Sequence, residues 1–157
     1  MARNGFTYIE LVITVAIIAI LAAVIMPLSQ ISSKRVKEAE LRQSLRMIRT
    51  AIDDYKRAWD EGKIKKSVGE SGYPPDLNIL VEGIDDASSA QSGRKIFLLR
   101  RIPRDPISKV KDTAPEETWG LRSYQSPPDD PQEGDDVFDI YSKSEEQALD
   151  GTYYKDW

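Results

Sequence analysis

Glu10 is the residue whose position in this sequence most needs a chemical explanation. It stands at the mouth of an uncharged run from Leu11 to Leu28, with Gly5 and Phe6 just before it. A carboxylate beside a run of that length and apolarity is costly unless a cation or strong hydrogen-bond donors accompany it. Two interpretations are open: Glu10 has a functional partner, or its side chain reaches back to the lipid headgroup region.

Catalytic chemistry finds little support elsewhere in the chain. There is no histidine, so the usual general base near neutral pH is absent. There is no cysteine, which removes thiol catalysis, disulfides and most zinc sites. No glycine-rich phosphate loop or nucleophile elbow is present. The sequence therefore predicts a protein that is not an enzyme.

The run from Leu11 to Leu28 has the length of a membrane-spanning helix. Its eighteen residues correspond to roughly 27 Å at ~1.5 Å per residue, close to the hydrocarbon thickness of a bilayer. A cleaved secretory signal is a poorer fit, because residues 26–30 lack a small-x-small cleavage site. Lys34, Arg35 and Lys37 follow the run, and a simple positive-inside count would place that side in the cytoplasm.

The N-terminus resembles the signature of type IV pilin-like proteins: Gly5-Phe6-Thr7, then Glu10, then an apolar helix interrupted by Pro27. The resemblance implies a leader of residues 1–5, which a prepilin peptidase removes between Gly5 and Phe6 before methylating the Phe6 amine. It also implies that residues 6–28 form a transmembrane and polymerisation segment, with the remainder in the periplasm, against the charge count. Glu10 of one copy would then face the Phe6 ammonium of another, so Glu10 and Pro27 are the expected assembly residues.

The chain continues as an amphipathic helix to about Trp59. Large apolar residues recur every three or four positions, which is one stripe at the helical period; they are Leu41, Leu45, Ile48, Ile52, Tyr55 and Trp59. Gly62 is expected to end this helix, and Pro27 is expected to kink or open it. Residues 29–157 would form one periplasmic head that includes this part of the helix.

The rest of the head is expected to be small and to contain strands. A short helix is predicted over 77–81, capped by Asp76 and closed by Gly83, followed by a surface loop over 85–93. Strands are predicted over 118–124 and 137–141, on either side of a proline-rich, acidic loop. The fold class is therefore α+β: a long N-terminal helix, half transmembrane and half amphipathic, packed on a small antiparallel sheet in a pilin-like head.

The head narrows the resemblance to the major (G-type) pseudopilins of type II secretion systems. The matching segments are Arg101-Ile102-Pro103-Arg104-Asp105-Pro106, Trp119-Gly120, Asp136-Val137-Phe138-Asp139-Ile140-Tyr141-Ser142, Gly151 and Trp157. One departure is that Ile107 follows Pro106, whereas in the family Trp-Gly often follows directly. The resemblance implies a subunit that polymerises from the inner membrane into a periplasmic pseudopilus and drives export across the outer membrane. Its partners would be copies of itself, minor pseudopilins, an inner-membrane assembly platform and the prepilin peptidase.

Heads of this family often bind calcium in the loop before the C-terminus. This chain offers Asp139, Glu145, Glu146 and Asp150 as candidate ligands, and calcium requires several hard oxygen donors. The loop lacks dense aspartate–glycine spacing, and a solvated acidic surface is the alternative. Leu149, Tyr153 and Trp157 are then expected to hold the loop by apolar packing.

Charge is distributed unevenly along the chain. Residues 29–59 contain eight Lys or Arg and four Asp or Glu, whereas residues 112–157 contain three and thirteen. Opposite patches of this kind can set register between copies, or they can be two solvated faces. Nucleic-acid binding is not expected, because the basic helix must pack within its own filament. The alternative functions are a type IV pilus subunit and a single-pass, membrane-anchored binding protein that does not polymerise.

Overall fold

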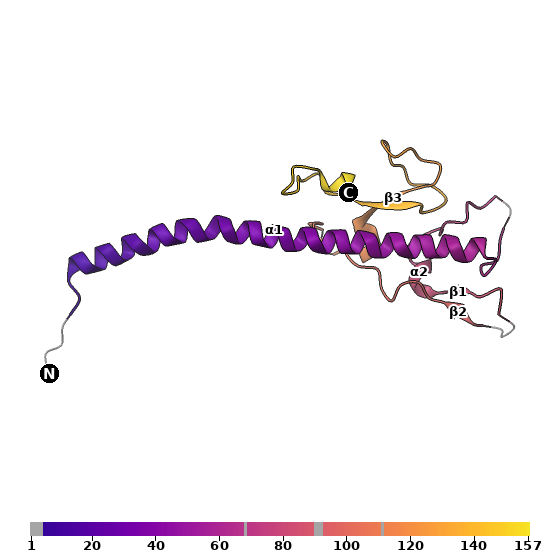
Figure 1. Ribbon diagram of the computed structural model, residues 1–157, viewed down its shortest axis with the longest axis horizontal. Coiled ribbons are helices and arrows are strands. Elements are labelled where there is room, and N and C mark those ends of the chain that lie inside the picture. Colours follow the sequence, from indigo (N-terminus) through magenta and orange to yellow (C-terminus); the bar gives the residue numbers. More distant parts are fainter. Residues whose placement is uncertain (1–4, 68, 90–92, 111) are drawn as a thin grey trace. The chain divides into compact units, whose positions relative to one another are not determined.

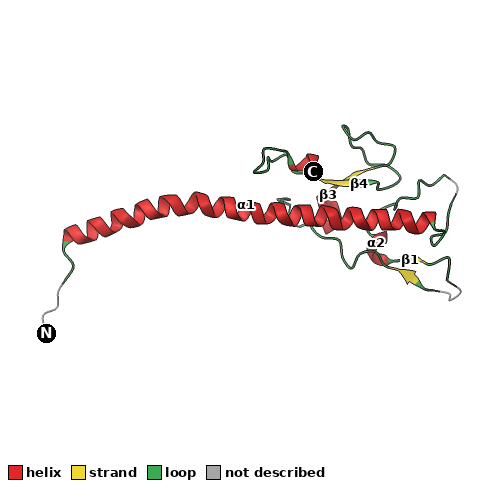
Figure 2. Ribbon diagram, in the orientation of Figure 1, coloured by secondary structure: helices red, strands yellow, loops and turns green. Residues whose placement is uncertain are grey.

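The computed structural model describes residues 5–67, 69–89, 93–110 and 112–157, and for residues 24–28 it describes the backbone only. The elements are α1 (Tyr8–Asp60), α2 (Ile79–Glu82), β1 (Ile84–Asp85), β2 (Lys95–Ile96), η1 (Pro115–Thr118), β3 (Trp119–Arg122), β4 (Asp139–Ser142) and η2 (Tyr154–Asp156) (Figures 1 and 2). The chain divides into two units, Met1–Val36 and Lys37–Trp157. The predicted α+β class with a long N-terminal helix and a small antiparallel sheet is confirmed.

The long helix α1 ends one residue beyond the predicted end at about Trp59. It stops where Gly62 adopts a left-handed backbone with φ of 75°, and the Gly62 N–H donates to the Trp59 carbonyl at 3.0 Å. The chain is α-helical across the position of Pro27. The expected opening of the helix at this proline therefore does not occur. A proline removes a single backbone donor, so one hydrogen bond of the helix is lost at this position. The side chain of Pro27 lies outside the described residues.

The second half of α1 forms the core of the head, as its periodicity predicts. The six stripe residues, Leu41, Leu45, Ile48, Ile52, Tyr55 and Trp59, are all buried, at 0–8 % exposure. They pack in one cluster with Leu80 from α2, Trp119 from β3 and Ile140 from β4. Fully burying one such side chain contributes roughly 1.5–3 kcal/mol, so this stripe supplies a large share of the stability of the head.

The strands β3 and β4 form the predicted antiparallel pair. Trp119 pairs with Ser142 and Arg122 pairs with Asp139, with Gly120 opposite Tyr141. A Cβ atom on Gly120 would lie 2.3 Å from the Tyr141 ring, so this ring packs directly over the glycine and would have to shift for any larger residue.

The pair β1 and β2 was not predicted. Ile84 pairs with Ile96 and Asp85 with Lys95, so Asp85 lies in a strand rather than in the expected surface loop. Each strand has two residues, which is too short to produce an alternating pattern in the sequence. The adjacent helix α2 is bounded by the two residues predicted to begin and end it. The Ile79 N–H donates to Asp76 Oδ1 at 3.0 Å, and Gly83 ends the helix with φ of 81°.

The unit Met1–Val36 presents apolar side chains on all sides of α1. Every large apolar residue from Phe6 to Leu21 is exposed, at 47–87 %. Within the described residues, no helix is both long enough and apolar enough to cross a membrane. The side chains of residues 24–28, which end the predicted membrane-length run, lie outside the described part of the chain.

Candidate functional site

Glu10 is held by Thr7 in a reciprocal helix cap. Glu10 Oε2 accepts hydrogen bonds from the Thr7 N–H at 2.9 Å and from Thr7 Oγ1 at 2.8 Å. The Glu10 N–H donates back to Thr7 Oγ1 at 3.3 Å. This arrangement is a capping box, in which two backbone donors at the helix start are satisfied by side chains. The carboxylate therefore has a local structural role that the sequence analysis missed, although the Thr-x-x-Glu spacing was its signal.

The capping box leaves part of the Glu10 carboxylate available. Both of its hydrogen bonds go to Oε2, and within the described residues Oε1 has no donor. A negative charge in the first turn is also favoured by the helix dipole. Glu10 can thus cap its own helix and still accept a cation through its second oxygen.

The predicted processing position lies just outside this cap. Gly5 and Phe6 precede the first turn of α1, Phe6 is 87 % exposed, and among the described residues nothing apart from the chain neighbours lies within 4 Å of where a Gly5 Cβ would stand. The peptide bond between them is therefore open to a peptidase. The residues upstream, 1–4, lie outside the described residues.

A second cluster joins the C-terminal segment to α1, and we call it the C-terminal clasp: Glu38, Arg42 and Arg49 of α1 with their partners in residues 139–157. The three α1 residues are four and seven positions apart, which places them on one helix face. Glu38 Oε1 accepts from the Leu149 N–H at 2.8 Å and from the Tyr154 hydroxyl at 2.9 Å. Burial and the bond to Glu38 raise the pKa of Tyr154 well above its usual value, so this hydroxyl stays a donor.

Arg42 and Arg49 complete the clasp. Arg42 Nη2 lies 3.1 Å from Asp150 Oδ2, and the guanidinium carbon lies 4.1 Å from the centre of the Trp157 ring. Arg49 donates through Nε to Asp139 Oδ1 at 2.7 Å, and through Nη2 to the Ile140 and Trp157 carbonyls at 2.9 and 2.7 Å. Arg49 therefore ties β4 and the end of the chain to the same helix.

The candidate calcium ligands are not brought together. Asp139 is paired with Arg49, Asp150 with Arg42, and Glu146 with Lys109 at 2.6 Å. The Thr152 hydroxyl and N–H, together with Arg42, lower the pKa of Asp150. Over the described residues, no three carboxylate, histidine or cysteine side chains are grouped to hold a metal ion. This donor set does not fit calcium, because the ion needs several carboxylate or carbonyl oxygens aimed at one point.

Apolar packing holds the C-terminal segment through Trp157, as expected, and through Tyr154, which takes the place expected for Leu149 and Tyr153. Tyr154 is fully buried, whereas Tyr153 and Leu149 are 42 % and 43 % exposed. Tyr153 pairs with Gln147 in a single β-bridge, and Tyr154 begins the 3-10 helix η2 with its side chain buried. Trp157 packs edge-on against Tyr154 with ring centres 5.2 Å apart.

Some of the head residues that carry the pseudopilin resemblance meet in the core, among them Asp105, Trp119 and Ile140. Asp105 is 2 % exposed, and its two oxygens accept from the Ile107 N–H at 2.8 Å and the Ser142 hydroxyl at 2.6 Å. The Trp119 indole donates to the Pro103 carbonyl at 2.8 Å. The residues inserted between Pro106 and Trp119 therefore do not prevent these segments from packing together.

The scan of protein-family models and the search of solved structures each found nothing that matches this chain. The geometry of the residues is thus the basis for a functional assignment.

Proposed function

We propose that this chain is a structural subunit of a type II secretion pseudopilus. After removal of residues 1–5, it would polymerise from the inner membrane into a periplasmic filament that drives protein export. The observation that carries the proposal is the N-terminal constellation: an accessible Gly5–Phe6 bond, a helix cap at Thr7 and Glu10, and an apolar helix surface directly behind it.

The exposed apolar surface of α1 requires a cover. A helix that is apolar on all sides is stable only inside a protein core, inside a membrane or among other helices. A monomeric soluble protein rarely exposes a contiguous patch of this extent. In the proposed function, lipid surrounds the apolar surface of α1 before assembly, and the α1 helices of other copies surround it afterwards.

The free oxygen of Glu10 supports the assembly step. Cleavage after Gly5 creates an ammonium on Phe6, and a carboxylate in apolar surroundings is stabilised by such a cation. Because Thr7 occupies Oε2 only, the pairing to a neighbouring copy does not require the cap to open.

The proposal is tested by overproducing the chain together with a secretion assembly platform. We expect filaments that a head-specific antibody labels in electron micrographs, and loss of both filaments and export of secreted proteins in cells lacking prepilin peptidase. Filaments without any effect on export would favour a type IV pilus subunit. A chain that stays monomeric in the membrane in the presence of the platform would contradict the proposal and favour an anchored binding protein.

A further inference from the structure

Two oppositely charged surfaces of the head stand out because neither contains a residue of the other sign. The acidic loop, residues 126–136, holds five carboxylates and no base: Asp129, Asp130, Glu133, Asp135 and Asp136. The basic segment, residues 94–104, holds five bases and no acid: Arg94, Lys95, Arg100, Arg101 and Arg104. Both belong to the unit Lys37–Trp157.

The acidic loop is closed by its own hydrogen bonds and exposes part of its negative charge. The Ser123 N–H donates to the Gln132 carbonyl at 2.9 Å, and the Gln132 N–H donates to Ser126 Oγ at 2.7 Å, which closes the loop from within. Asp129, Glu133 and Asp135 are exposed, and within the described residues none of them has an ion pair or a hydrogen bond. The loop therefore presents unneutralised carboxylates on an ordered backbone.

The basic segment is also anchored and keeps unpaired charge. The Leu98 and Leu99 N–H groups donate to the Leu80 carbonyl of α2 at 3.1 and 2.8 Å. Arg104 is engaged with the Thr113 carbonyl at 2.7 Å. Arg100 and Arg101 come directly after Leu99. Both are exposed, and their side chains contact no acceptor in the described part of the chain.

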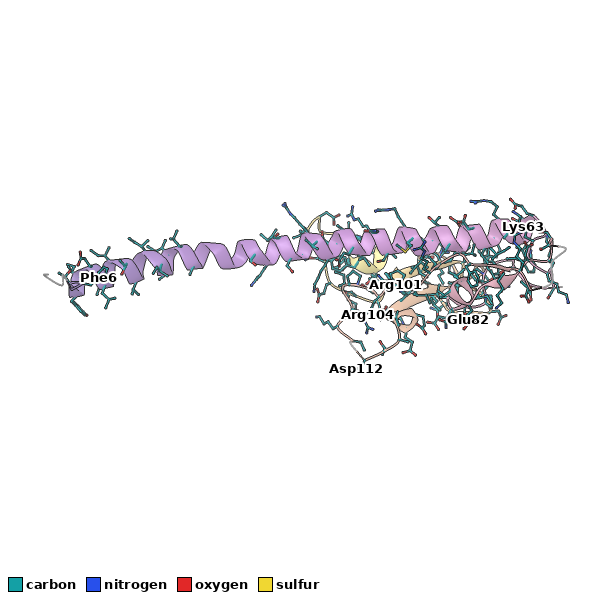
Figure 3. All side chains as sticks on the ribbon, turned by 90° about the horizontal axis from the view of Figure 1, so that it is seen from below. Phe6, Lys63, Glu82, Arg101, Arg104 and Asp112 are labelled. Atoms are coloured by element: carbon teal, nitrogen blue, oxygen red, sulfur yellow. The ribbon has the colours of Figure 1, made fainter. Side chains whose placement is uncertain are left out.

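In the view of Figure 1 the two surfaces lie on either side of α1, and in Figure 3 the head lies to one side of that helix. Figure 1 shows the loop after β3 on one side of the helix and α2, β1 and β2 on the other. The bonds to Leu80 place the basic segment beside α2, and Figure 3, which views the molecule from that side, labels Arg101 and Arg104 there. Within the described residues, no ion pair joins the acidic loop to Arg100 or Arg101 of the same head.

We infer that the acidic loop of one copy docks on Arg100 and Arg101 of a second copy of this chain. The inference rests on the proposed function and names the contact between heads. Complementary charge favours this partner, since opposite surfaces steer association and fix register. Because two different surfaces meet, the contact is heterologous, and heterologous contacts continue into rings or helical filaments instead of closing as a dimer.

Engineered cysteines test this contact, because the natural chain contains none and gives no background disulfide. In full-length filaments, the pair Glu133→Cys with Arg101→Cys should give, on oxidation, a ladder of dimers, trimers and larger species. Each single variant should give no species beyond a dimer. The matched control is Glu133→Cys with Lys63→Cys, since Lys63 is a half-exposed base outside the basic segment. An equal ladder from this control would overturn the inference.

Charge reversal gives a second readout. Arg100→Glu with Arg101→Glu should lower filament yield at least about tenfold, because like charges then face each other. Adding Asp129→Lys and Glu133→Lys to the same chain should restore the yield. Normal filaments from the arginine variant, or filaments without a cysteine ladder, would overturn this contact and leave the proposed function standing. Absence of filaments from the unsubstituted chain would overturn both.

Discussion

The Tyr154 hydroxyl donates to Glu38 Oε1 at 2.9 Å, joining the last turn of the chain to α1 across 116 positions. The same oxygen accepts the Leu149 N–H, so a single carboxylate atom fixes two points of the C-terminal segment. This contact, with Arg42 and Arg49 on the same helix face, explains how the segment can be held on the helix by side chains of the protein alone.

Burial of Tyr154 should contribute more to the clasp than its ion pairs. Tyr154 is fully buried, and truncating a buried aromatic residue to alanine costs about 3–5 kcal/mol. Arg42 and Asp150 are half-exposed, and an exposed pair of this kind is worth about 0–1 kcal/mol. In chemical denaturation of residues 29–157, we expect Tyr154→Ala to lower the free energy of unfolding by several-fold more than Asp150→Ala. Equal losses would show that the ion pairs dominate.

Calcium should have little effect on the head. We expect residues 29–157 to be a folded monomer whose melting temperature is nearly the same in excess calcium and in chelator, because Asp139, Glu146 and Asp150 are each paired with a different base. A site occupied at 100 times its dissociation constant would add ~2.7 kcal/mol, which a melting curve readily detects. A shift of many degrees on chelation would mean that Asp139, Glu145, Glu146 or Asp150 bind the ion after all.

Acid should loosen the clasp through Asp150. The pKa of this group is lowered in the folded state, so its stabilising effect is complete above the unfolded value, about 3.9, and is lost as the pH falls through the folded value. We expect the stability of the wild-type head to decline below about pH 4, and Asp150→Asn to show a shallower decline over the same range. The comparison requires denaturation curves at several pH values for both proteins. Parallel declines would exclude Asp150 as a contributor.

Glu10 variants can separate its capping role from its charge. Glutamine keeps an acceptor for the Thr7 N–H, as in other capping boxes, but removes the negative charge. We expect Glu10→Gln and Glu10→Ala to insert and fold normally and both to lose filaments, because the Phe6 ammonium then has no counter-charge. Filament yield and head folding can be measured on the same membranes. If only the alanine variant failed, the cap and not the ion pair would be the essential feature.

The parts of the fold that the sequence predicted are those with a long local period or a clear boundary residue. The stripe from Leu41 to Trp59 and the stop at Gly62 are of this kind, and β3 and β4 follow from runs of strand-forming residues between proline-rich segments. The two-residue strands β1 and β2 are too short to produce such a pattern. The clasp depends on pairs such as Glu38 with Tyr154, which no local pattern relates. The cap of Thr7 on Glu10 is local, and its spacing could have been recognised.

The most direct test of the proposed function is the intact mass of the protein extracted from membranes of cells with an active prepilin peptidase. The account predicts a chain that begins at Phe6, with the mass of residues 6–157 plus one methyl group on the new amine. The same protein from cells without the peptidase should retain residues 1–5 and carry no methyl group. A chain that keeps residues 1–5 in the presence of the active peptidase would contradict the pseudopilin assignment.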